Sequence, residues 1–375
     1  MAEQQKKTAD DGGASGGIAW TQETWNLVVG CSKVSAGCTN CYAEKMAARF
    51  SGEGMPFHGL SDGKRWTGAV RFRTDRLKQP LHWTRPRLVF VNSVSDLFHE
   101  NLPFDQIAAI FGVMARASRH TFQVLTKRPQ RMLDFFAWLE GRVAVAHSDQ
   151  TIVDACRHRR YHDILRSCAE GYGVTIPKPA QDPAWPLPNV WLGVSAEDQD
   201  AANARVPLLL RAPAAVRWVS AEPLIGRLDL TNLDDRDPRH PTRAPAYGGY
   251  DALRGSAYWA GEVSGWLCYE KAPRPDERRS HLDWVVVGGE SGPGARQCWH
   301  EWLVRVVRDC KDADVPVFVK QLGAAYNDPE DGVAGPAFKG DTYGMRRLTH
   351  PKGGDVSEWP EALQVRQWPK GYALP

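Results

Sequence analysis

Leu88-Val89-Phe90-Val91 is a short run without a single polar residue, and Val285-Val286-Val287 is another. Strands of a parallel sheet are covered on both faces, so they read as continuous apolar runs instead of alternating between apolar and polar residues. Both runs are therefore typical of buried parallel strands.

Runs of this kind alternate along the chain with longer amphipathic stretches, which is the pattern of repeated βα units. We expect strands at Trp25–Val29, Leu88–Asn92, Thr121–Leu125, Val190–Val194, Val216–Ser220, Trp284–Gly288 and Val315–Lys320. We expect helices at Asn40–Phe50, Pro103–Ser118, Pro129–Leu139, Asp198–Leu210 and Trp299–Cys310. The pattern predicts an α/β fold, a parallel βα barrel of TIM-like type that is either partial or complete.

Four segments differ in composition from the βα repeat. Residues 1–17 are rich in Gln, Gly and charge and predict a disordered leader before a barrel that spans 18–325. Residues 141–186 and 231–282 lack the apolar periodicity of a separate core, so we expect two irregular insertions or lids. Residues 326–375 are rich in Gly and Pro and predict an extension that wraps the surface.

The composition is that of a soluble chain with ample core. It has 375 residues, of which 42% are hydrophobic, and a formal net charge of +3, which argues neither for nor against a nucleic-acid partner. No run of about eighteen apolar residues and no signal-peptide core is present. We therefore expect a cytoplasmic protein with no membrane partner.

Residues 31–41 set Cys31, Cys38 and Cys41 in a C-x6-C-x2-C loop. Structural zinc takes four ligands, and a [4Fe-4S] cube that only carries electrons takes four cysteines. Three thiolates suggest a cube with one iron left open, as in radical S-adenosylmethionine (SAM) enzymes, although their usual spacing is C-x3-C-x2-C. A zinc site completed by His99 or by Cys298 fits the loop alone equally well.

Polar residues follow nearly every predicted strand, where a parallel barrel places its chemistry. They are Asn92, Ser93, Ser95, Asp96, His99, Glu100, Thr126, Lys127, Arg128, Ser195, Glu197, Ser220, Glu222, Glu290, Ser291, Lys320 and Gln321. Any one of them could cap a helix or end a strand. The inference of a shared site rests on their joint placement beside the cysteine loop.

Particular roles follow from this placement. In the turn Gly288-Gly289-Glu290, backbone amides can approach a ligand and the carboxylate can receive a cationic amine, although a tight structural turn explains the glycines as well. Tyr42 is placed to pack on the cluster or on an adenine. We assign cofactor binding to Ser93, Asp96, Ser195, Gly288, Gly289, Glu290 and Tyr42, and catalysis at the substrate to Glu222, Lys127 and Lys320.

Several motifs together resemble one family. They are Thr24-Trp25-Asn26, Cys41-Tyr42-Ala43-Glu44, residues 92–99, 189–195, 220–224, 283–296 and 319–321. In this order they are similar to the phage "Gp thirty-seven/Gp sixty-eight" family, a domain of unknown function also described as a three-Cys-motif, radical-SAM-like protein. The resemblance implies phage, prophage or bacterial origin and a [4Fe-4S] cluster on the three cysteines. It also allows for a partner protein encoded nearby.

The leading hypothesis is a radical-SAM-like [4Fe-4S] enzyme that generates a 5′-deoxyadenosyl radical, with nucleic acid or a nucleotide as the substrate that a phage setting favours. The alternative is a zinc-stabilised nucleic-acid-binding protein without catalytic activity. Its phosphate contacts would come from a basic stretch with interleaved aromatics, namely Arg71, Arg73, Arg76, Lys78, Trp83, Arg85 and Arg87. A metal-free hydrolase is less favoured, because no nucleophile elbow is present.

Overall fold

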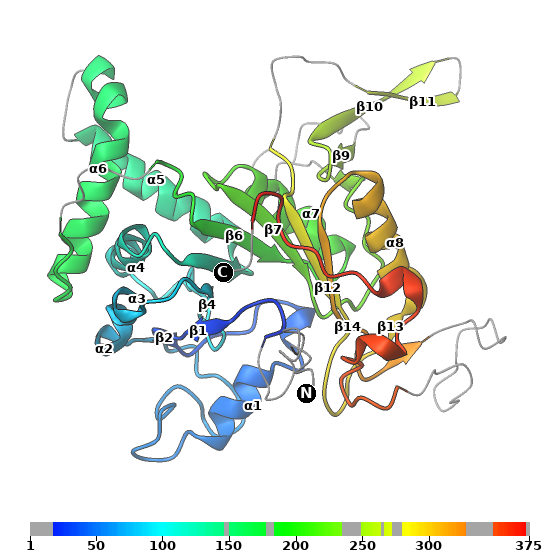
Figure 1. The fold of residues 1–375 in the computed structure, drawn as a ribbon, viewed down its shortest axis with the longest axis horizontal. Helices are drawn as coiled ribbons and strands as arrows, with labels where there is room; N and C mark the ends of the chain where they lie inside the picture. Colours follow the sequence, from blue (N-terminus) through cyan, green and yellow to red (C-terminus); the bar gives the residue numbers. More distant parts are fainter. Residues whose placement is uncertain are drawn as a thin grey trace, which may run out of the picture.

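A sheet of seven parallel strands forms the centre of the computed structural model (Figure 1). The structure describes residues 18–145, 150–177, 184–234, 249–263, 266–271, 280–327 and 348–372. The strands are β1 (Glu23–Trp25), β4 (Leu88–Val91), β5 (Thr121–Thr126), β6 (Val190–Ser195), β7 (Val216–Ala221), β12 (Trp284–Gly288) and β14 (Val317–Gln321). The leader predicted for residues 1–17 lies outside the described residues.

The strands lie side by side in the order in which they occur along the chain, and every pair is parallel. A consecutive order with right-handed crossovers puts all connecting helices on one face, whereas a doubly wound sheet reverses its order and has helices on both. The sheet accordingly curls into a half-barrel. The prediction of a partial parallel βα barrel is confirmed at this level.

Helices cover the convex face of the sheet. They include α4 (Phe104–Arg116), α5 (Pro129–Val145), α7 (Gln199–Leu210) and α8 (His300–Asp312), and two short helices, α2 (Thr74–Leu77) and α3 (Gln79–His82), precede β4. Their apolar side chains share one core with every second residue of the strands, such as Val89, Val285 and Val287. The predicted helices are confirmed, with boundaries that shift by a few residues.

A separate aromatic core fills the concave face. It consists of the alternate strand residues, among them Phe90, Trp191, Trp218 and Trp284, together with Trp20. Gly193 makes this packing possible, because a Cβ at that position would lie 2.4 Å from the Trp218 ring.

We predict that Gly193→Ala lowers the free energy of unfolding by about 1–3 kcal/mol, the usual cost of overfilling a packed core. The matched control is Gly141→Ala in α5, where a Cβ meets nothing within 4 Å. It should raise stability by about 0.5–1 kcal/mol, because it removes backbone entropy from the unfolded chain. Urea unfolding of both variants checks the pair, and equal effects at the two positions would contradict the packing argument.

The two ends of the described chain complete the concave core. Trp20 packs edge-on against Trp218 with ring centroids 5.1 Å apart, and Tyr372 packs against Trp191 at 4.8 Å. Gln367 also joins the edge of the sheet, because its backbone N–H donates to Val317 O at 3.0 Å. The prediction of an extension that wraps the surface is therefore incomplete: most described residues of the tail are not buried, but Trp359 and Leu363 are, and Trp368 and Tyr372 pack on the aromatic core.

The first predicted strand, Trp25–Val29, is also wrong in part. β1 ends at Trp25, and β2 (Val28–Val29) turns away to pair antiparallel with β3 (Arg71–Phe72). The cause is Asn92, which adopts a φ of 63° at the end of β4. Its Oδ1 accepts hydrogen bonds from Leu27 N at 3.2 Å and Val28 N at 3.1 Å, so a side chain takes the place of the next strand.

The two insertions are more regular than predicted. The first contains α6 (Gln150–Gly171), which packs on α4 through Tyr161, Leu165 and Ala169. These three residues are spaced i, i+4 and i+8, and an apolar stripe this narrow is not recognisable in the sequence of a charged segment. The second contributes a four-stranded antiparallel sheet of β8 (Leu233–Asp234), β9 (Gly249–Asp251), β10 (Ser256–Val263) and β11 (Trp266–Lys271).

Among the described residues, no helix combines the length and the apolar character that crossing a membrane requires.

Candidate functional site

The cysteine loop connects β2 to the helix α1 (Tyr42–Arg49). Cys31, Cys38 and Cys41 are each half-buried in it. Gly30 starts the loop with a φ of 96°, and a Cβ there would lie 2.2 Å from Ala69 O, so only glycine fits. The chain then makes one 3₁₀ turn over Ala36–Cys38 before α1 begins.

Arg128, which follows β5, holds the first part of the loop. Its guanidinium donates to Ser32 Oγ at 2.7 Å and to Ser32 O at 3.1 Å, and Nη1 lies 4.0 Å from Cys31 Sγ. The same group pairs with Asp96 at 3.1 Å and with Glu100 at 2.7 Å, both after β4. One cation thus joins the loop to the carboxyl ends of β4 and β5.

Glu197, which follows β6, holds the middle of the loop. Its Oε1 accepts from Gly37 N at 3.1 Å, and its Oε2 accepts from Arg205 Nη1 at 2.7 Å. The carboxylate is 1% exposed, and a Cβ on Gly37 would come within 2.9 Å of it. Burial alone would raise its pKa, but the Ser35 hydroxyl and the charges of Arg205 and Lys127 hold the pKa at about 2.

This shift predicts a pH-dependent effect of Glu197→Gln. Because the folded-state pKa is below the ordinary 4.5, the carboxylate stabilises the fold above that pH and loses its contribution as the pH falls toward about 2. Wild type should therefore exceed the variant in unfolding free energy at about pH 7, and the excess should shrink by about pH 3. Urea unfolding across this range is the measurement, and a constant difference would contradict it.

Glu290, which follows β12, holds the last part of the loop. Arg296 grips its carboxylate with two hydrogen bonds of 2.6 and 2.9 Å, and Asn40 Nδ2 donates to it at 3.0 Å. Arg296 Nη1 also donates to Ala36 O at 2.8 Å. These contacts lower the pKa of Glu290 against the effect of its burial. The sequence predicts that Glu290 binds a cationic amine. Such a ligand would have to displace Arg296 from the carboxylate.

The three charged groups seat one loop on the carboxyl ends of β4, β5, β6 and β12. This is the end of a parallel barrel where ligands bind. The structure thus brings the cysteine loop together with the predicted Asp96, through Arg128, and with the predicted Glu290, through Asn40.

Burial and the nearby Asp96 raise the pKa of the Cys31 thiol to about 12. Within the ranges that the structure describes, no three His, Cys, Asp or Glu side chains stand close enough to share one metal ion. His99, the fourth ligand of the zinc alternative, uses both ring nitrogens: Nε2 bonds Ser32 Oγ at 3.0 Å, and Nδ1 accepts from Asn101 N at 3.1 Å. Its burial lowers its pKa, which favours the neutral ring.

The remaining predicted residues form smaller contacts. Tyr42 is 58% exposed, and its hydroxyl donates to Ser93 O at 2.8 Å. Lys320 and Glu222 form an ion pair of 2.5 Å between the ends of β14 and β7. Ser195 is buried, with its carbonyl bound by Arg205, and Lys127 contributes its backbone N–H to Asp96 at 3.0 Å.

Gly288 and Gly289 serve the packing of strands. A Cβ on Gly289 would lie 2.1 Å from Leu322 O, and one on Gly288 would lie 2.9 Å from Gln321 O. Because neither residue has a side chain, the chain after β12 can lie close to the chain after β14. The glycines are thus explained by a tight structural turn, the alternative to a role in ligand binding.

Sequence reasoning missed the residues that position the loop. The sequence places Arg128 and Glu197 at strand ends but indicates no role for them, and it does not point to Arg205, Arg296 or Asn40. Arg205 offers a weak signal, because it is a charged residue among the apolar ones of α7. Arg296 offers none, since its partner Glu290 lies in a turn with no periodicity.

The chain belongs to the family described as "Protein of unknown function (DUF5131)", whose profile matches residues 15–353. No curated protein and no solved structure matches it.

Proposed function

We propose that this protein is a radical-SAM-like [4Fe-4S] enzyme of phage or prophage type, with Cys31, Cys38 and Cys41 as the cluster ligands. The observation that supports the proposal best is the seat of the cysteine loop. A loop with three thiols rests on four strand ends of a parallel half-barrel, held by Arg128, Glu197 and Glu290.

The donor set fits a cube by its chemistry. Cysteine thiolates are the usual ligands of iron–sulfur clusters, and three of them leave one iron open. A cube binds each cysteine through a different iron, so its ligands stand farther apart than those of a single ion. When bound, the cluster would supply one electron to the sulfonium of SAM, and the 5′-deoxyadenosyl radical so formed would abstract hydrogen from the substrate.

Arg128 opposes the effect of burial and of Asp96, which raise the pKa of the Cys31 thiol. Arg128 stands 4.0 Å from Cys31 Sγ and is fixed by Asp96, so it can stabilise thiolate charge without moving. Outer contacts of this kind orient ligands and tune a metal centre. Gly37 N–H and Asn40 are fixed by the carboxylates of Glu197 and Glu290, which limits the motion of the two cysteines beside them.

We assign the substrate side of the site to Glu222, Lys320 and Lys127. Glu222 and Lys320 neutralise each other in a pair whose side chains are 15% and 21% exposed. Such a pair can exchange its internal contact for polar groups of a substrate. Nucleic acid or a nucleotide is the substrate class that we propose, on the basis of the phage-family resemblance, which also allows for a partner protein encoded nearby.

The test is anaerobic reconstitution, followed by electron paramagnetic resonance of the dithionite-reduced protein with and without SAM. We expect the signal of a cube that changes when SAM is added, because SAM binds at the open iron. A cube signal indifferent to SAM would overturn the SAM assignment. A colourless protein with one zinc per chain would overturn the cluster and favour the nucleic-acid-binding alternative.

A further inference from the structure

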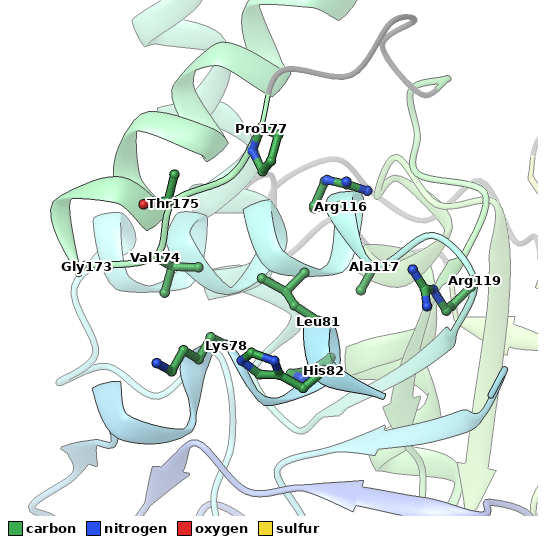
Figure 2. Close-up of a pocket in the computed structure, with 11 residues that line it drawn as sticks. Lys78, Leu81, His82, Arg116, Ala117, Arg119, Gly173, Val174, Thr175 and Pro177 are labelled. Atoms are coloured by element: carbon green, nitrogen blue, oxygen red, sulfur yellow. The ribbon is translucent and has the colours of Figure 1, made fainter. Parts of the chain in front are cut away.

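A second candidate site lies at the other end of the sheet. A pocket of about 410 Å³ opens between the segment Lys78–His82, the end of α4 and the segment Gly173–Pro177 after α6 (Figure 2). The first two segments lead into the amino ends of β4 and β5. The cysteine loop contacts residues that follow the carboxyl ends of the same strands, so the pocket is separate from it.

The pocket is basic. Lys78, His82, Arg116 and Arg119 line it, and none of its eleven described lining residues is Asp or Glu. All four side chains belong to exposed residues. In the part of the chain that the structure describes, neither Lys78 nor Arg116 pairs with a carboxylate, and Arg119 donates only to Trp83 O at 3.4 Å.

The structure divides the basic stretch noted in the sequence. Arg71 binds His58 O at 2.7 Å, Arg76 binds Asn26 O at 3.2 Å, and Arg73 pairs with Asp75 at 2.8 Å. Arg87 pairs with Glu23. These four cations therefore have partners within the fold. Lys78 from the same stretch lines the pocket on the side opposite to Arg116 and Arg119, with Leu81 and His82 between them (Figure 2).

The dipole of α4 does not explain why so many cations line the pocket. The carboxyl end of a helix carries the equivalent of about half a negative charge, which one cation more than compensates. Three permanent cations around one pocket give it a positive potential that no carboxylate among its lining residues offsets. Such a potential attracts an anion.

We propose that this pocket binds the phosphate group of a nucleotide, either free or within a strand of nucleic acid. Arginine and lysine are the usual phosphate ligands in proteins. Leu81, Ala117 and Val174 give the pocket an apolar wall against which a base can pack, and its volume is within the usual range of ligand sites, roughly 300–1,000 Å³. The proposal does not depend on an iron–sulfur cluster.

The experiment measures binding by fluorescence anisotropy at low salt, with a labelled mononucleotide in one arm and a labelled single-stranded oligonucleotide in the other. The test variant is Lys78→Gln/Arg116→Gln. The control is Arg211→Gln, which removes an exposed arginine from the end of α7, a helix end away from the pocket. A second variant, Thr175→Trp, fills the pocket without changing its charge.

We expect the double variant to weaken binding at least tenfold, Thr175→Trp to weaken it similarly, and Arg211→Gln to change it less than twofold. Binding of both probes, or of the mononucleotide alone, assigns the pocket to free nucleotides. Binding of the oligonucleotide alone assigns it to a strand, and its salt dependence should then fall by about one to two phosphate contacts in the double variant. No binding of either probe, or equal affinity in all variants, overturns the proposal.

Discussion

Cys38→Ala is expected to remove most of the iron that the wild-type protein holds after anaerobic reconstitution, while the barrel stays folded. Cys38 is half-buried on a surface loop, and its thiol makes a weak contact with Ser35 Oγ at 4.0 Å, so little packing is lost with the thiol. A cube on three cysteines cannot be held firmly by two. The measurements are iron and sulfide content per chain and the far-ultraviolet circular dichroism spectrum.

Cys168→Ala is the matched control for this prediction. Cys168 is also a partly buried free thiol, but it lies in α6 on the convex side of the sheet. The Cys168→Ala variant should therefore bind as much iron as the wild-type protein. Full iron content in Cys38→Ala would remove the basis of the cluster assignment, whatever the result of the control.

Arg128→Ala should lower the free energy of unfolding by about 3 kcal/mol. The change leaves Asp96 without its cation, and breaking a buried ion pair costs about 3–5 kcal/mol. The lower end of this range applies, because Asp96 keeps hydrogen bonds from Thr126 and from the backbone of Phe98 and Lys127. Urea unfolding of the metal-free protein gives the value without interference from a cluster.

Arg73→Ala provides the comparison for Arg128. Its ion pair with Asp75 is short but exposed, with the acid 60% accessible, so its loss should cost less than about 1 kcal/mol. Arg128→Lys should fall between wild type and Arg128→Ala, since lysine keeps the charge but cannot reach Asp96, Glu100 and Ser32 together. A loss below about 1 kcal/mol in Arg128→Ala would mean that the loop is not seated by this cation.

The strands of the sheet were predictable because burial on two faces leaves a continuous apolar run. Trp284–Gly288 has the predicted bounds, and the other strands beyond the first shift by one or two residues. The predictions fail where a residue or helix far away in the sequence determines the local structure. Asn92 diverts the chain after Trp25 from 67 positions downstream, and α6 buries one face against α4 and α5.

The candidate site was predictable in its place but not in its contacts. Strand-end polar residues were expected at one mouth, and several of them meet the cysteine loop there. The contacts themselves join residues far apart in the chain: Arg128 is 97 positions from Cys31, and Glu197 is 160 from Gly37. No local pattern records such a pairing, so the roles of Arg128, Glu197 and Arg296 required the structure.

The use of both chain ends to fill the concave core bears on how the protein folds during synthesis. Trp20 leaves the ribosome early, but Trp368 and Tyr372 emerge only after the whole sheet has been translated. Until then, Trp191 lacks the ring of Tyr372, which packs on it at 4.8 Å, and the indole N–H of Trp284 lacks its acceptor, Gln367 O. Part of this aromatic surface therefore stays open to other chains until residues 367–372 have been translated, a period in which chaperones can bind it.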